Sequence, residues 1–144
     1  MSTVLITGCD TGIGREFAIQ YLAAGGHVIA TYRDIANALP AAPTLINAQV
    51  DVTDFAAIER LKSDLAGRPI DILISNAAIG LDSMKIGEID YARVRAMFEI
   101  NTIGALKVIE TFIDEVARSE ERRIVIISSR MGSMGDNLSG GGYG

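Results

Sequence analysis

Short apolar runs alternate with amphipathic stretches along this chain, and that alternation limits its fold more than any other feature. Continuous β-branched runs are typical of buried strands, whereas apolar residues three and four positions apart are typical of helix faces. The predicted strands are 3–7, 27–32, 45–50, 70–75 and 123–128, and the predicted helices are 12–24, 55–65 and 90–118. Strands separated by helices form right-handed crossovers and a parallel sheet with helices on both faces. We therefore predict an α/β fold built on an open, doubly wound sheet.

Composition excludes several classes of protein. The 144 residues are 49% hydrophobic with a net charge of -5, which disfavours both disorder and general binding to nucleic acid. No apolar run is long enough to span a membrane, and residues 1–4 lack the features of a signal peptide. Cys9 is the sole cysteine, which excludes a disulfide scaffold and is typical of a reducing, cytoplasmic location. No composition shift divides residues 1–144, so we predict one domain.

The first strand is followed by a glycine-rich turn, Thr7 to Gly14, with the sequence TGCDTGIG. Ligands of doubly wound sheets bind beyond the carboxyl ends of the strands, where this turn lies. Gly8 would allow the sharp exit from the strand, Gly12 the close approach of a pyrophosphate, and Gly14 close packing of helix on strand. The helix N-terminus would then offer free N–H groups to phosphates. The spacing is neither G-x-G-x-x-G nor a Walker loop, and an ordinary glycine-rich turn is the alternative interpretation.

Four further motifs follow this turn in order, and with them the chain resembles the short-chain dehydrogenase/reductase family. The first of the four is the pair Asp51-Val52 after the third strand. Ser75-Asn76-Ala77-Ala78 follows the fourth strand and departs from the family's Asn-Asn-Ala-Gly at both ends. Asn101 lies in the helix before the fifth strand, and Ile127 to Gly132 is the Ser-bearing segment after that strand. The sequence of 128–142 is most similar to the branch of small carbonyl reductases that includes Sniffer-type and C-factor-like proteins.

The resemblance implies a Rossmann-type dinucleotide-binding domain with strand order 3-2-1-4-5. It also implies a set of cofactor-binding residues: Gly8, Thr11, Gly12, Ile13, Gly14, Arg33, Asp51, Val52, Asn76, Ala77 and Ala78. Arg33 after the second strand favours NADP, because a guanidinium pairs with a 2′-phosphate. Two alternatives stay open: Asp34 could bind the ribose of NAD, or the two residues could form a solvated pair at a helix start.

The resemblance also implies the catalytic residues of a carbonyl or alcohol oxidoreductase. Ser129 would hydrogen-bond the substrate oxygen, with Ser128 as the alternative, and Asn101 would hold a water of the proton relay. The family's acid/base is a Tyr followed four residues later by a Lys. Tyr143 is the only Tyr after Ser129, and in the similar branch the catalytic Tyr lies two positions further on. We therefore expect the acid/base beyond this sequence, with Tyr143 as the candidate within it. No group of residues has the spacing of metal ligands.

We thus predict an NADP(H)-dependent oxidoreductase that interconverts a small carbonyl and an alcohol. A truncated dinucleotide-binding module and an NADP-sensing regulatory protein, both without turnover, are the alternatives. The fifth strand would be an exposed apolar edge, and the final strands of the family would be missing, so we expect a piece of a longer reductase or an edge covered by a partner. The helix 90–118 is a candidate surface for a homo-oligomer, and no nucleic acid or membrane partner is expected.

Overall fold

The computed structural model describes residues 1–80, 86–133 and 135, so Tyr143 lies outside the described residues. Its centre is a five-stranded parallel sheet in the predicted order β3-β2-β1-β4-β5. The strands are β1 (Thr3–Ile6), β2 (His27–Tyr32), β3 (Leu45–Gln49), β4 (Ile72–Ser75) and β5 (Arg123–Ile126). The strand β2 has the predicted bounds, and the other four strands are one or two residues shorter than predicted, because their apolar runs continue into the flanking loops. The Rossmann-type fold is therefore confirmed.

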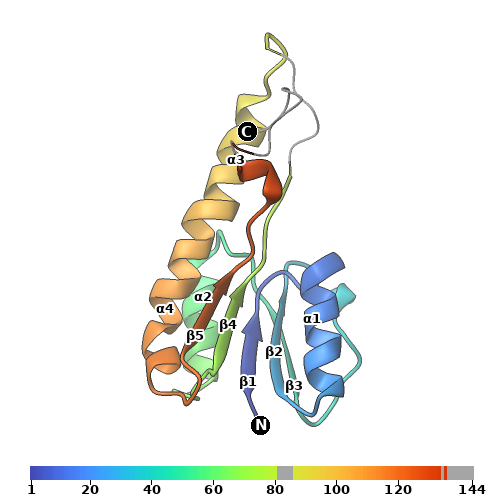
Figure 1. Ribbon diagram of the computed structural model, residues 1–144, viewed down its shortest axis with the longest axis vertical. Coiled ribbons are helices and arrows are strands. Elements are labelled where there is room, and N and C mark those ends of the chain that lie inside the picture. Colours follow the sequence, from blue (N-terminus) through green and yellow to red (C-terminus); the bar gives the residue numbers. More distant parts are fainter. Residues whose placement is uncertain (81–85, 134, 136–144) are drawn as a thin grey trace.

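Helices cover both faces of the sheet (Figure 1). On one face, α1 (Gly12–Ala23) packs Ala18 against β1 and β2. On the other face lie α2 (Phe55–Asp64) and α4 (Ala105–Ala117), in a cluster with Leu5, Ile29 and Leu73. Side chains of β1 alternate between the two clusters, since Val4 and Ile6 face α1 while Leu5 faces α2 and α4. The central strands are therefore buried on both sides.

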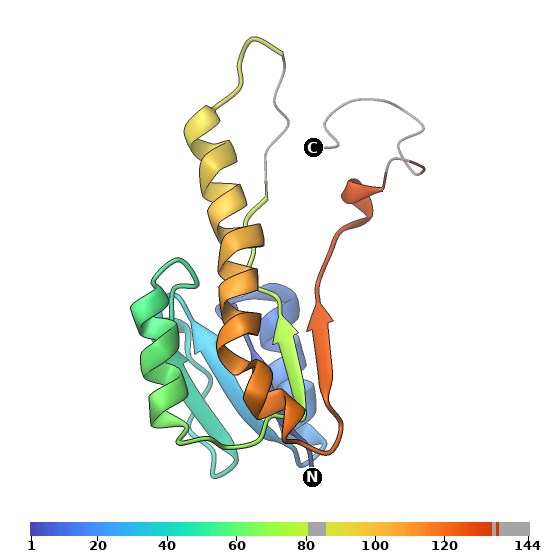
Figure 2. The same cartoon turned by 90° about the vertical axis from the view of Figure 1, so that its left-hand side faces the viewer.

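The predicted helix 90–118 is interrupted. It comprises α3 (Tyr91–Phe98), a π-helical segment η2 (Glu99–Gly104) and α4, which together form the long column seen in Figure 2. A π turn holds more residues than an α turn and shifts the phase of the apolar stripe. The apolar pattern of 90–118 predicts that Val94 and Leu106 belong to the core, and this prediction is wrong, since they are 40% and 62% exposed. The buried face of α4 runs through Val108, Phe112 and Val116.

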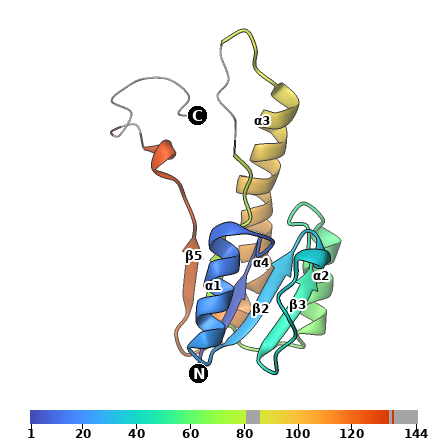
Figure 3. The same ribbon diagram turned by 90° about the vertical axis from the view of Figure 1, so that its right-hand side faces the viewer.

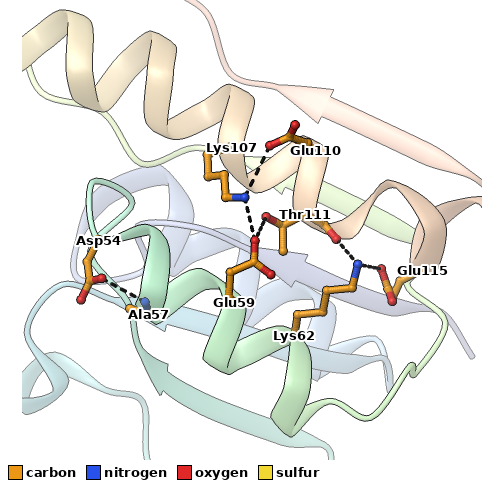
Figure 4. Close-up of polar contacts among 8 residues, drawn as sticks. All are labelled: Asp54, Ala57, Glu59, Lys62, Lys107, Glu110, Thr111 and Glu115. Atoms are coloured by element: carbon orange, nitrogen blue, oxygen red, sulfur yellow. Dashed lines mark hydrogen bonds and ion pairs between the residues drawn. The ribbon is translucent and has the colours of Figure 1, made fainter.

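Polar contacts join α2 to α4 (Figure 4). Lys62 Nζ lies 3.5 Å from Glu115 Oε2 and donates a hydrogen bond to the Thr111 carbonyl. Glu115 is buried, and its other oxygen accepts from Arg118. Nearer the N-terminus of α4, Lys107 Nζ donates to Glu59 at 2.6 Å. A buried carboxylate needs such cations because an uncompensated buried charge costs several kcal/mol, so these contacts hold α4 against α2.

The strand β5 lies at the edge of the described sheet and pairs only with β4 there. Ile124, Val125 and Ile126 are between 36% and 59% exposed. The predicted apolar edge is therefore present. In the described part of the chain, no helix has the length and apolarity needed to cross a membrane.

Candidate functional site

Two neighbouring clefts open at the carboxyl ends of the strands. The first cleft, of about 400 Å³, is lined by the turn after β1, by Arg33 after β2, by Asp51 and Val52 after β3, and by 76–79 after β4. The second cleft, of about 500 Å³, is lined by 75–80, Met97, Asn101 and 126–129. The two share the walls 76–79 and Ile127, and thus form one crevice of the size that small-ligand sites occupy.

Two glycines of the turn allow the backbone to approach the loop after β4. Gly8 has a φ of +73°, and a Cβ on it would lie 2.8 Å from the Cα of Ala77. A Cβ on Gly14 would lie 2.4 Å from both the Gly8 carbonyl oxygen and Nδ2 of Asn76. Any side chain at these positions would force the two loops apart.

The side chains of Thr7 and Asn76 tie the same two loops together. Thr7 Oγ1 accepts hydrogen bonds from the backbone N–H groups of Asn76 and Ala77, both at 3.0 Å. Asn76 Nδ2 donates to the carbonyls of Thr7 and Gly8, at 3.0 and 3.1 Å. Because its amide nitrogen bonds to the turn, Asn76 shapes the turn as well as lining both clefts.

The N-terminus of α1 has no side-chain cap, unlike the three helix starts that an Asp caps. Asp34, Asp54 and Asp90 each accept backbone N–H bonds at the start of η1 (Ile35–Asn37), α2 and α3, respectively. Thr11 occupies the same position of α1 and makes no side-chain cap bond. The adjacent Gly12 has a φ of +60°, and a Cβ there would meet no atom within 4 Å. Without a side-chain cap, the backbone donors and the positive dipole end of α1 could accept an anion.

Arg33 and Asp34 occupy different surroundings at the end of β2. Arg33 lines the first cleft. The Asp34 carboxylate instead accepts the N–H of Ala36, at 3.0 Å, and Asp34 is absent from the described lining of that cleft. Of the two residues considered for the ribose end of a dinucleotide, the fold brings Arg33 to the cleft wall.

The wall after β3 is formed by Asp51 and Val52 at the place predicted for them. Asp51 Oδ1 accepts hydrogen bonds from the backbone N–H and the hydroxyl of Thr53, which hold its carboxylate at the cleft. Val52 is buried against the π-helical segment, since a Cβ on Gly104 would lie 2.8 Å from its Cγ2. Gly104, the last residue of η2, therefore leaves room for Val52 because it has no side chain.

In the second cleft, the structure brings together Asn101 and the two serines that follow β5. Asn101 Oδ1 accepts the N–H of Ile79 and its Nδ2 donates to the carbonyl of Ile79, both at 2.9 Å. Arg93 of α3 donates to the carbonyl of Gly80, so η2 and α3 hold the loop after β4 from one side. Ser128 and Ser129 are exposed on the opposite wall.

Cys9 belongs to the glycine-rich turn, and its side chain is fully buried. Its Sγ donates to the Ile6 carbonyl at 3.4 Å, and burial raises the pKa of this thiol to about 12.

We therefore expect Cys9 to resist thiol reagents at pH 8 in native protein. The folded thiol stays protonated while the unfolded one ionises, so the free energy of unfolding should fall as pH rises from about 9 to about 12. Cys9→Ala should make that fall smaller in denaturant titrations, and rapid native labelling at pH 8 would contradict this assignment.

Comparison with known proteins agrees with this geometry. A family model described as short chain dehydrogenase matches residues 2–143, which is nearly the whole chain. The chain belongs to the short-chain dehydrogenase family. It is 37% identical over 146 residues to 1-hydroxy-2-glutathionyl-2-methyl-3-butene dehydrogenase of Rhodococcus sp. (strain AD45), covering 99% of this chain and 63% of that protein. This member of the family thus spans less than two thirds of that relative's length.

Solved structures of the family superpose well on this one. A carbonyl reductase from Pseudomonas aeruginosa PAO1 has a TM-score of 0.82 at 31% identity, covering 98% of this chain and 67% of that one. A short-chain dehydrogenase/reductase from Burkholderia multivorans with bound NADP has a TM-score of 0.77 at 27% identity, covering 97% and 64%. The carbonyl reductase match agrees with the branch that the residues after β5 resemble.

Sequence reasoning missed several contacts that shape the crevice. Asp10, Ile79 and Arg93 were not singled out, although each makes hydrogen bonds between elements that form a cleft wall. The one signal that pointed to such a role was the position of Asp10 between two glycines of the turn. Within the described residues, no group of three or more His, Cys, Asp or Glu side chains is placed to hold a metal ion.

Proposed function

We propose that this chain forms one dinucleotide-binding domain of an NADP(H)-dependent oxidoreductase that interconverts a carbonyl and an alcohol. The uncapped N-terminus of α1, beside Gly12 and facing the first cleft, is the observation that carries the proposal. A pyrophosphate there would accept the free backbone donors of α1. Asp51 and Val52 would contact the adenine end, and Ala77 and Ala78 would line the passage into the second cleft.

Two observations support NADP over NAD. Arg33 lines the first cleft, where its guanidinium can pair with a 2′-phosphate, while the Asp34 carboxylate caps η1. The related Burkholderia multivorans structure contains NADP. An acidic residue that binds a ribose 2′-hydroxyl needs its carboxylate directed into the cleft, and Asp34 uses one carboxylate oxygen within its own turn.

The second cleft would hold the carbonyl substrate. The cofactor would supply the hydride, and the protein must orient the substrate oxygen and deliver a proton. Ser129 would donate a hydrogen bond to that oxygen. Asn101 Nδ2 and Oδ1 each have one further hydrogen bond to offer beyond those to Ile79, which leaves capacity for a relay water. The proton donor is expected to be a Tyr, and Tyr143, the candidate within this sequence, lies outside the described residues.

Turnover of NADPH with a panel of aldehydes and ketones tests this proposal. We expect oxidation of NADPH by the whole protein with its Tyr acid/base in place, and a fall in kcat of about 100-fold in Ser129→Ala, the cost of losing one donor to a developing oxyanion. NADPH affinity should stay unchanged in that variant, and the neighbouring Ser128→Ala should have a smaller effect. Tight binding without turnover would instead favour a nucleotide-binding module, and absence of nucleotide binding would contradict both.

We further propose that the column α3–α4 forms a homo-oligomer interface. Tyr91, Phe98, Leu106 and Ile113 are between 44% and 65% exposed. They are seven, eight and seven positions apart, and the π-helical segment absorbs the extra residue, so that the four form one stripe. Light scattering should find a dimer or larger assembly that Leu106→Glu disrupts, and a monomer at micromolar concentration would contradict the proposal.

A further inference from the structure

We propose that Asp10 is a positioning residue that makes the first cleft prefer a nucleotide with a 2′-phosphate. It would do so by fixing the backbone that carries Arg33. This inference rests on the proposed function and adds a determinant of cofactor choice to it.

The Asp10 side chain bridges the turn after β1 and the segment after β2. Its Oδ2 accepts the backbone N–H of Arg33 at 3.0 Å, and its Oδ1 accepts that of Asp34 at 2.9 Å. Asn37 Nδ2 lies 3.4 Å from the same Oδ1. Both carboxylate oxygens thus bond to the segment 33–37, whose first residue lines the cleft.

The segment 33–37 has a second anchor on α1. Arg15 Nη1 donates to the Asn37 carbonyl at 2.5 Å. The glycine-rich turn and the helix that follows it therefore hold both ends of this segment. Figure 3 shows α1 and β2, the two elements that precede these anchors, in the same part of the fold. Because the guanidinium of Arg33 is at the end of a long flexible side chain, a fixed backbone reduces the number of positions that the guanidinium can occupy.

Asp10 also lines the first cleft, but its contacts argue against a direct role as a ribose ligand. Burial raises the pKa of its carboxyl, and the hydrogen bonds from Asp34, Arg33 and Asn37 are among the contacts that together outweigh burial and lower it. The group is therefore a carboxylate at neutral pH. The negative charge of Asp10 repels a 2′-phosphate and so lowers the affinity for it, whereas the positioning of Arg33 raises that affinity. The two effects of Asp10 on 2′-phosphate binding therefore have opposite signs.

Opposite signs make the inference testable with Asp10→Asn, which removes the charge and keeps the shape. In the variant, an amide NH₂ faces one backbone N–H, so one of the two anchors becomes a donor–donor contact. We expect the preference for 2′,5′-ADP over 5′-AMP, measured by calorimetry, to fall about tenfold, the size of one charge-assisted hydrogen bond. Affinity for 5′-AMP should change little.

Asp54→Asn is the matched control. Asp54 also accepts a backbone N–H through its carboxylate, from Ala57 at 3.0 Å in Figure 4, and is absent from the described lining of the first cleft. Its substitution should lower the melting temperature without changing the nucleotide preference. Asp10→Ser, which keeps one short acceptor, is a second test should Asp10→Asn fail to fold, and the same loss of preference is expected.

Three outcomes would overturn the inference. An increased preference for 2′,5′-ADP in the Asp10 variants would mean that simple charge repulsion dominates. An unchanged preference with a lower melting temperature would mean a purely structural role. An equal loss in Asp54→Asn would mean a general effect of stability. If the unmodified protein binds neither ligand, or binds both equally, the proposed NADP function fails before the role of Asp10 is reached.

Discussion

Gly14→Ala should destabilise the protein by about 3 kcal/mol or more, the upper range for overpacking a tight contact. The added Cβ would lie 2.4 Å from the Gly8 carbonyl oxygen and from Asn76 Nδ2. The first atom belongs to the backbone, and the second is held by hydrogen bonds to Thr7 and Gly8, so neither can move cheaply. Denaturant unfolding of the variant and the unmodified protein measures the difference.

Gly12→Ala is the matched control, because it adds the same methyl group two residues away. Its Cβ would meet no atom within 4 Å, so the expected cost is the left-handed backbone conformation alone, about 1–2 kcal/mol. A methyl group at this open position would stand where we propose that a pyrophosphate binds. We therefore expect Gly12→Ala to lose nucleotide affinity while staying folded. Equal stability losses in the two variants would contradict the close approach at Gly14.

Arg33→Ala should weaken NADPH binding by about 10- to 100-fold and leave NADH binding unchanged. That range corresponds to the 1.5–3 kcal/mol of a hydrogen bond to a charged group, about one or two factors of ten in affinity. Arg33 is the cation at the first cleft that the sequence singled out for a 2′-phosphate, and the structure has it in the cleft wall. Fluorescence or calorimetric titration of both cofactors measures the change.

Two further variants separate this explanation from its alternatives. Arg68→Ala removes the same charge at the opposite, amino-terminal end of the sheet, and should leave both affinities unchanged. Asp34→Ala should cost stability through the loss of a cap but not weaken NADH. If Asp34→Ala abolishes NADH binding and Arg33→Ala has no effect, the protein uses NAD and our assignment of the cofactor is wrong.

The fold could be predicted largely from local patterns. A strand buried on both faces must be apolar throughout, and Val4, Leu5 and Ile6 meet that condition before any contact is known. Asp54 stands directly before the apolar face of α2, where Asp is a preferred cap, and its carboxylate makes that bond. The exposed edge at β5 followed from the predicted strand order.

The predicted core face of the helix 90–118 was wrong in part for a physical reason. A count of 3.6 residues per turn assumes a regular helix, and the π-helical segment changes that count between Phe98 and Ala105. Leu106 was therefore assigned to the core, whereas the structure leaves it exposed and buries Val108. Asn101 within the predicted helix was the one sign of a local irregularity.

By itself, the sequence determined the strands, the helices and which loops meet at one edge of the sheet, because burial and periodicity act along the chain, and the resemblance to the family implied the order of the strands. It also identified the glycines of the turn. Only the tertiary structure decided which contacts those loops make. Asn76 hydrogen-bonds the turn, Asp34 caps η1, and Asp10 holds the backbone of Arg33. Such contacts depend on distances between residues far apart in the chain, and packing of the whole sheet sets those distances to within a hydrogen bond's reach.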